Sequence, residues 1–162
     1  MKSKQKIAVL ILLGIFSLIT EVKAQVNPMP ADHLMIMPTD IIWVDGPASL
    51  PPGAKIAVID GDPAAAGLFT MRIKVPANYK IMPHSHPANE HITVIEGSFY
   101  MGMGKKFDEK TAMEIPRGGF AEMNAGNLHF AFAKKESIIQ LHGMGPWEIN
   151  YVNPADDPRN KE

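Results

Sequence analysis

The stretch "HSHPANEHITVIEG", residues 84–97, holds three of the six histidines of the chain. His84 and His86 lie two residues apart, so both imidazoles leave the same face of an extended strand. The intervening "PAN" favours a turn, which would bring the carboxylate of Glu90 back beside the two imidazoles. The same alternation places His91 on the opposite face, so we expect it outside this cluster.

A second stretch, "GGFAEMNAGNLHFAFA" (residues 118–133), brings in a more distant histidine. His129 opens an alternating run in which two alanines share its face, while Phe130 and Phe132 take the opposite one. Small neighbours leave room around His129, as a ligand that faces a cavity requires. A core histidine beside two alanines would show the same pattern, so this stretch alone allows both interpretations.

Short apolar runs separated by turn residues continue along the chain from Ile41 to Val152. The segments between them are rich in glycine, proline and aspartate, and no window keeps a helical period long enough for a major helix. Eight or more short strands in one domain indicate an antiparallel sandwich or a small barrel. The expected strands are "IIWV", "AKIAVI", "LFTMRIKV", "HITVIEG", "SFYMGM", "LHFAFA", "SIIQLHG" and "WEINYV".

The two histidine stretches resemble the two sequence motifs of the cupin superfamily. The first has the spacing His, one residue, His, three residues, Glu, six residues, Gly, with Gly97 as its closing glycine. The second has Gly118, Gly126 and His129 in register. Three positions depart from the usual glycine, proline and asparagine of the motifs, namely Asn78, Asn124 and Ala133. None of the three positions is a metal ligand in the family.

The resemblance covers residues 41–152 and implies an all-β, single-domain cupin, that is, a double-stranded β-helix or jelly-roll barrel. It also implies one divalent transition metal inside the mouth of the barrel, held by His84, His86, Glu90 and His129. Three neutral imidazoles and one carboxylate suit Zn, Fe, Mn, Ni and Co alike, so the identity of the metal stays open. The entry "LPPGAKIAVIDGDP" and the ending "GMGPWEINYVNPADDPR" resemble the cupin sensor domain of zinc-dependent anti-sigma factors.

Beyond the ligand set, strand alternation suggests three candidate catalytic residues. Arg72 is a candidate anion anchor, and Gln140 and His142 share a strand face as polar candidates. A structural or surface role is an equal alternative for each of them. The eleven methionines fit gap-filling core positions better than metal ligands, because no Met-rich run occurs.

The ligand set and the resemblance favour an exported metalloenzyme that acts on a small oxygen-rich molecule. Dioxygenase-type oxidoreduction is slightly ahead of isomerisation. The alternative is a non-enzymatic module that binds or senses a small molecule or a metal, because a fold class does not choose a function. Phe130 and Phe132, on an outer sheet face, would suit a two-fold homodimer.

Composition limits the partners and the location of the protein. A net charge of −1 offers no basic surface for nucleic acid, and the absence of cysteine excludes disulfides. Residues 1–24 have the layout of a signal peptide, whose 13-residue apolar run is shorter than the roughly 20 residues of a membrane anchor. We therefore expect a periplasmic or secreted protein, free of the membrane after cleavage. The expected order is an extended arm (25–40), the barrel (41–152) and a flexible tail (153–162).

Cleavage after Ala24 is directly testable. Protein recovered from its native host should begin at Gln25, because the short polar stretch after the apolar run ends in a small residue suited to signal peptidase. N-terminal sequencing or intact mass measurement reports the first residue. Recovery of chains that begin at Met1 in a membrane fraction would contradict the predicted export.

Overall fold

Strand pairing organises the described part of the chain into two antiparallel sheets. The computed structural model describes residues 33–161, so the predicted signal peptide and most of the predicted arm lie outside the described residues. Met35–Glu162 form one unit, and His33 and Leu34 are the only described residues of the other unit. A search of the described residues finds no helix with the length and apolar character needed to cross a membrane.

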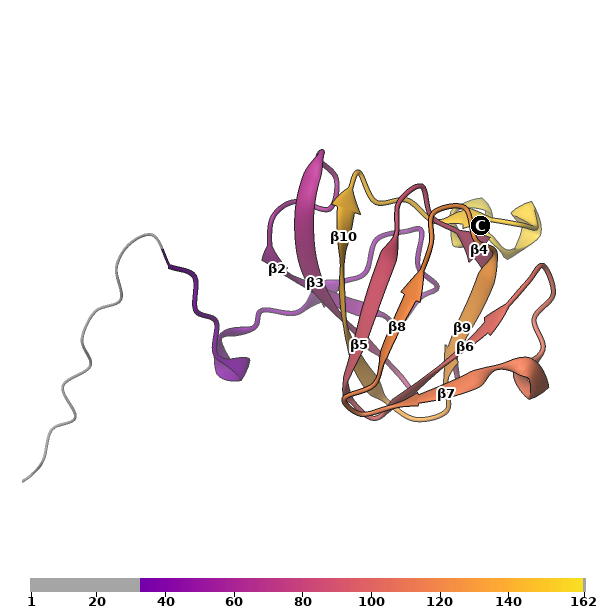
Figure 1. The fold of residues 1–162 in the computed structure, drawn as a ribbon, viewed down its shortest axis with the longest axis horizontal. Helices are drawn as coiled ribbons and strands as arrows, with labels where there is room; N and C mark the ends of the chain where they lie inside the picture. The colour runs from indigo at the N-terminus through magenta and orange to yellow at the C-terminus, as the bar shows by residue number, and fades with distance from the viewer. Residues whose placement is uncertain (1–32, 162) are drawn as a thin grey trace, which may run out of the picture. The chain divides into compact units, whose positions relative to one another are not determined.

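The two sheets contain six and five strands, in the orders β1-β2-β3-β10-β5-β8 and β11-β4-β9-β6-β7 (Figure 1). The first sheet consists of β1 (Val44–Asp45), β2 (Lys55–Asp60), β3 (Gly67–Val75), β10 (Ser137–Gly145), β5 (Glu90–Glu96) and β8 (Phe120–Met123). The second consists of β11 (Asn150–Tyr151), β4 (Tyr79–Ser85), β9 (His129–Ala133), β6 (Ser98–Met103) and β7 (Met113–Pro116). The chain crosses repeatedly between the sheets, as in a jelly-roll barrel. The all-β prediction is confirmed.

The core lies between the sheets because each strand turns alternate side chains inward. In β3 the inward set is at most 5% exposed and consists of Phe69, Met71, Ile73 and Val75. The residues between them, including Arg72, face outward and are partly exposed. Each large apolar side chain buried in this way contributes about 1.5–3 kcal/mol to folding. The alternation in "LFTMRIKV" therefore predicts the two faces of this strand correctly.

Three strands escaped the sequence prediction for identifiable reasons. β4 contains Pro83, which cannot donate to a ladder and interrupts the apolar pattern. β7 and β8 are four-residue strands at the sheet edges, on either side of the turn at Gly118, and are too short to show alternation. The predicted bounds of "IIWV" and "WEINYV" were wrong, since β1 pairs only Val44 and Asp45, and β11 pairs only Asn150 and Tyr151.

Part of the outer face of the five-stranded sheet is covered by the connection between β6 and β7. Phe130 and Phe132 lie opposite His129, as alternation predicts, but they are 0% and 2% exposed. Phe107, between β6 and β7, packs on them with ring centroids 4.8 and 5.7 Å apart. The expectation that these two phenylalanines form an exposed dimer surface is wrong. The homodimer stays a prediction without that support.

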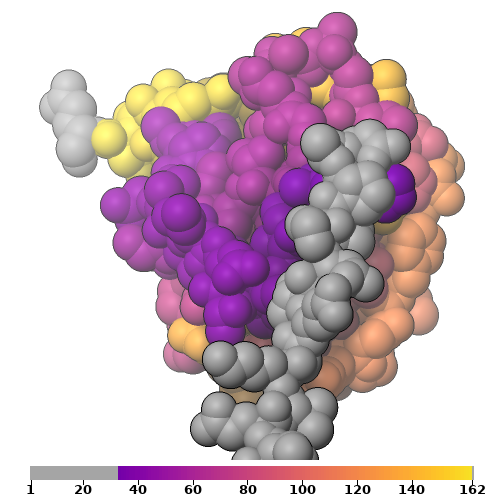
Figure 2. Space-filling view, turned by 90° about the vertical axis from the view of Figure 1, so that its left-hand side faces the viewer, coloured from indigo at the N-terminus to yellow at the C-terminus, as the bar shows by residue number. Residues whose placement is uncertain are grey.

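The C-terminal residues form local structure where the sequence predicts a flexible tail. They fold into two single-turn 3-10 helices, η3 (Pro154–Asp156) and η4 (Pro158–Asn160). Nη2 of Arg159 donates to the carbonyl oxygen of Ile149 at 3.0 Å, which ties η4 to the segment before β11. Figure 2 shows the yellow C-terminal residues beside the purple segment that contains loop 46–54, and a surface hollow lies between this loop and η4. The mobility of the tail stays a prediction.

Two turn positions show how the motif residues act on the backbone. Gly97 follows β5 with φ of +73°, and a Cβ atom there would lie 2.6 Å from the carbonyl oxygen of Glu136. Asn78 has φ of +63° and is the only non-glycine residue with positive φ among residues 33–161. Asparagine tolerates the left-handed region better than most residues. The departure from the motif glycine at Asn78 therefore preserves the turn before β4.

Substitutions at Asn78 test this backbone requirement. Asn78→Gly should leave the free energy of unfolding nearly unchanged, whereas Asn78→Ala should lower it by about 1 kcal/mol because alanine is strained at positive φ. Urea unfolding measures both, with Asn127→Ala as a control at an exposed asparagine of negative φ. An equal loss of stability in the glycine and alanine variants would contradict the requirement.

Candidate metal centre

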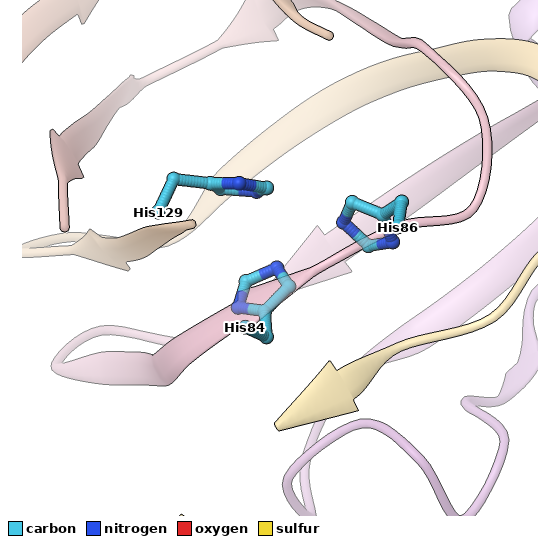
Figure 3. A group of neighbouring side chains, drawn as sticks. All are labelled: His84, His86 and His129. Atoms are coloured by element: carbon cyan, nitrogen blue, oxygen red, sulfur yellow. The ribbon is translucent and has the colours of Figure 1, made fainter. Parts of the chain in front are cut away.

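Three histidines and one glutamate, drawn from both sheets, meet inside the barrel. His84 lies in β4, His86 follows that strand directly, and His129 begins β9. Glu90 begins β5, in the other sheet. Each of the four is 5% exposed or less. Figure 3 shows the three imidazoles turned toward one another.

Strand pairing and two connected turns bring these distant residues together. His84 and His129 are direct partners in the ladder between β4 and β9. In the turn before β9, the N–H of Gly126 donates to the carbonyl oxygen of His86 at 2.9 Å. Asn89, in the connection between β4 and β5, accepts a backbone N–H from the same turn at 3.0 Å. The backbone therefore holds the two motif stretches against each other next to the cluster.

The candidate ligand atoms are close enough to share one ion. One ring nitrogen from each of His84, His86 and His129 lies within 4.8 Å of the others. Glu90 stands beside this group, with Oε1 3.5 Å from Nε2 of His86 and Oε2 3.3 Å from Nε2 of His129. Ligands that each lie about 2.1 Å from a metal are roughly 3 to 3.5 Å apart. The contacts of the carboxylate match that spacing.

Backbone carbonyls fix the orientation of all three rings. Each Nδ1 lies 2.6 to 3.0 Å from a carbonyl oxygen. The carbonyls belong to Met82 for His84, Glu148 for His86 and Asn127 for His129. A carbonyl oxygen only accepts, so each Nδ1 carries the proton and donates it, which leaves the Nε2 lone pair of a neutral ring free. Hydrogen bonds of this kind orient the histidines of metal sites.

The inward-facing atoms lack hydrogen-bond partners among the residues that the structure describes. Nε2 of His86, Nε2 of His129 and Oε2 of Glu90 are buried and unpaired. The approach of His129 to Glu90 is not a hydrogen bond, because both atoms are acceptors once Nδ1 holds the proton. Each unpaired buried acceptor costs about 1–3 kcal/mol. Imidazole and carboxylate lone pairs aimed at one point form the donor set of a divalent transition metal, so the residues fit such an ion.

Burial sets the protonation state of the cluster. Burial, and then the imidazoles of His129 and His86, lower the pKa of His84 to about 3. Burial also lowers the pKa of His86, against the opposing effect of Glu90. Burial raises the pKa of Glu90, whereas the electrostatic effect of the surrounding imidazoles lowers it; the net direction is downward, so the carboxylate stays ionised. At neutral pH, neutral His84 and His86 beside an ionised Glu90 are in the form that binds a cation.

A cavity that opens to solvent adjoins the cluster. Its walls come from both sheets and are almost entirely apolar. Pro47, Ser49 and Trp147 are lining residues that also reach solvent, so we place the opening beside them. Trp147 stacks on His86 with ring centroids 4.0 Å apart and an interplanar angle of 18°. One of the candidate ligand rings therefore also borders the path into the cavity.

The other sequence candidates lie on the outer face of the six-stranded sheet and do not line this cavity. Nε of Arg72 donates to Oε1 of Gln140 at 3.2 Å. His142 stacks on His91 with centroids 4.9 Å apart, and Nε2 of His91 lies 3.4 Å from Oε1 of Glu122. His91 therefore faces away from the cluster, as alternation predicts. The placement of Arg72, Gln140 and His142 lends no support to a catalytic role.

Two features of the site carry no sequence signal. The acceptors that orient the imidazoles are backbone carbonyls, which every residue possesses, so no residue type marks them. Trp147 follows a glycine- and proline-rich turn, and nothing in its immediate sequence indicates that it stacks on a histidine 61 positions earlier. Asn89 was visible as a turn former, but its bond across to the second motif stretch requires the three-dimensional structure.

Comparisons with known proteins bear on the fold rather than on the reaction. The sequence matches no family profile and no curated protein. Two antiparallel sheets that enclose a histidine cluster are the architecture of the cupin fold, and solved cupins match it over most of their length. An RmlC-like cupin from Shewanella frigidimarina NCIMB 400 matches with a TM-score of 0.54 and 14% identity, over 70% of this chain and 91% of that one.

Two further solved structures carry names that describe an activity. The polyketide cyclase RemF from Streptomyces resistomycificus matches with a TM-score of 0.60 and 18% identity, over 78% of this chain and 90% of that one. A protein from Methylibium petroleiphilum PM1, proposed to be an acetylacetone dioxygenase, matches with a TM-score of 0.59 and 16% identity, over 82% and 89%. The chain therefore has the cupin fold, as the motifs predict. The relation to anti-sigma sensor domains stays a prediction.

The lowered pKa values predict how the metal-free protein responds to acid. Because the pKa of His84 is about 3 in the folded state and near 6.5 in the unfolded state, the unfolded chain takes up this proton first as the pH falls. Stability is therefore full above about pH 6.5 and declines toward pH 3. We expect the melting temperature of chelator-treated protein to fall by about 5 °C between pH 7.5 and pH 5.5.

Two variants separate this effect from general acid destabilisation. His84→Gln removes one of the two buried rings with a lowered pKa and should reduce the pH dependence, while His86 keeps the remainder. His91→Gln removes an imidazole from the outer face of the sheet and should leave the pH dependence of the melting temperature unchanged. A melting temperature that is constant between pH 7.5 and pH 5.5 in the unaltered metal-free protein would contradict the assignment.

Proposed function

We propose that this protein is an exported metal-binding cupin that acts on a small oxygen-bearing molecule. One divalent transition metal is held by His84, His86, Glu90 and His129. The observation that carries the proposal is the set of buried, unpaired acceptors that point inward from rings fixed by backbone carbonyls. Such an arrangement is costly unless a cation pairs with it. The signal-peptide layout of residues 1–24 supports the export.

Within this proposal, dioxygenase-type oxidoreduction is the favoured reaction. Isomerisation needs a separate group to move protons, and the described lining offers no histidine, carboxylate or lysine beyond the four site residues. A redox-active divalent metal in the site would supply Lewis acidity and electron transfer with dioxygen. The likeness of the fold to the proposed acetylacetone dioxygenase agrees with this choice of reaction.

The residues of the chain have distinct tasks in this function. The imidazoles of His84, His86 and His129 provide neutral donors, and Glu90 reduces the charge of a bound divalent ion to about +1. That remaining charge attracts one anionic oxygen of a substrate. The apolar walls limit water around the reacting group and so strengthen these electrostatic contacts.

A non-enzymatic binding or sensing module is the second candidate function. The same absence of a proton-transferring side chain from the described lining favours it, because pure binding needs none. A metal that joins ligands from both sheets would also stabilise the barrel. The two functions therefore share the metal site and differ in turnover.

Metal analysis followed by oxygen measurements tests the proposal. Protein purified without chelators or nickel affinity resin should contain about one transition-metal ion per chain. After loading with Fe(II) or Mn(II), it should consume dioxygen with at least one member of a panel of enolisable ketones and diols. Metal binding without turnover, together with a large loss of thermal stability on metal removal, would favour the binding module. Absence of any metal binding would contradict both functions.

A matched pair of variants controls for general effects of charge. Glu90→Gln keeps the shape of the side chain but removes the charge from the site, so we expect metal affinity to fall by at least about tenfold. Glu122→Gln makes the same change on the outer sheet face and should leave the affinity unaltered. Equal affinity in the two variants would exclude Glu90 as a ligand.

A further inference from the structure

The cavity beside the candidate metal centre is selective in its chemistry. Apart from the four site residues, its described lining has only two hydrogen-bonding side chains, Ser49 and Trp147, and both reach solvent. No lysine, arginine or acidic side chain other than Glu90 lines it. The least exposed wall residues, at 1–2% exposure, are Ile92, Phe99, Ile139 and Leu141. A ligand that enters therefore meets polar groups at the metal and apolar groups along the walls.

We infer that the site takes a monoanionic molecule with two adjacent oxygen donors at one end and an apolar body at the other. This inference rests on the proposed function and names its substrate class. The oxygen donors occupy the positions that four protein ligands leave open on the metal. The apolar body lies against the walls formed by β3, β6 and β10. Sugar acids and other polyhydroxylated molecules are excluded by the same lining.

The net charge of the occupied metal site limits the ligand to one negatively charged group. A divalent ion with neutral imidazoles and one carboxylate carries a net charge of about +1, which one anionic oxygen neutralises. A second anionic group would lie in the apolar part of the cavity, where the described walls provide no cation. A buried charge without a partner is strongly unfavourable. The site should therefore reject dianionic ligands even when their chelating end is suitable.

Hydrogen bonding sets the polarity of the body. Each hydroxyl group carried into the apolar walls would lose its bonds to water without replacement. Each methylene group carried into the same walls gains about fourfold in affinity from removal of apolar surface from water. The loss of hydrogen bonds by hydroxyl groups and the gain from buried methylene groups therefore both favour an alkyl or aryl body, up to the size that the cavity holds.

A series of hydroxamates with one chelating group and different tails tests this inference. Titration calorimetry on the zinc-loaded protein, with metal-free protein as the background, measures each affinity. From acetohydroxamate to hexanohydroxamate, affinity should rise about fourfold for each methylene that enters the cavity. A tail of similar length that ends in a hydroxyl or carboxylate should bind at least about tenfold more weakly than hexanohydroxamate. Affinity that is independent of the tail, or highest for the carboxylate tail, would overturn the inference.

Two methionines provide a matched pair of variants. Met71 lines the cavity and is 5% exposed, whereas Met144 is 49% exposed and lies outside it. Met71→Gln places a carboxamide of similar size in the wall and should reduce the preference for hexanohydroxamate over its hydroxyl-ended analogue by about tenfold. Met144→Gln should leave that preference unchanged. An unchanged preference in a folded, zinc-loaded Met71→Gln protein would contradict the assigned wall.

The zinc content of each sample distinguishes failure of the proposed metal site from failure of the proposed ligand class. Protein that binds no zinc would remove the metal site and this inference together. Protein that binds zinc and hydroxamates without regard to the tail would remove the inference alone and leave the proposed function standing. If Met71→Gln does not fold, the tail series on the unaltered protein decides the question by itself.

Discussion

Three hydrogen bonds from imidazole Nδ1 atoms to backbone carbonyls are the constraint on which the site depends. They decide which nitrogen of His84, His86 and His129 carries the proton, and so they turn an unprotonated Nε2 inward on each ring. Because the carbonyls belong to the strands and turns themselves, the orientation is built into the folded backbone. The site is therefore arranged before any ion arrives, which lowers the entropic cost of binding one.

The position of the cluster links the two sheets of the barrel. The histidines lie in or directly after strands of the five-stranded sheet, and Glu90 is the first residue of β5 in the six-stranded sheet. A cation held by all four would join the sheets at the point where the turn before β9 already meets the β4–β5 connection through Asn89. Stability and ligand binding would then depend on the same few atoms. The apolar cavity begins at these atoms, so the walls and a bound metal would act on opposite ends of one ligand.

The sequence predicts which histidines lie together better than it predicts the bounds of the strands around them. Strand alternation and motif spacing select His84, His86 and His129, which the structure brings together, and they set His91 apart on the outer face. These predictions succeed because a period of two fixes side-chain direction once a strand is recognised. Alternation also separates the apolar and polar faces of β3. It could not decide whether the polar face of this strand points into a pocket or outward. The structure places Arg72, on the polar face, outside the cavity.

The predictions that failed depend on contacts between distant segments. β7 and β8 are short and lie at sheet edges, so their own residues give too weak a pattern. The cover that Phe107 provides over Phe130 and Phe132 comes from a loop whose path no local signal indicates. The apolar character of the cavity emerges only when the inward faces of several strands are combined.

Nitrogen NMR of histidine in the zinc-loaded protein reports directly which ring nitrogens carry protons and which bind the metal. With ¹⁵N-labelled histidine, we expect three rings that carry a proton on Nδ1 and bind the metal through Nε2, with the same protonation in the metal-free protein near pH 7.5. The rings assigned to His91 and His142 should show no metal shift. Coordination through Nδ1, or metal shifts at fewer than three of the rings of His84, His86 and His129, would contradict the account.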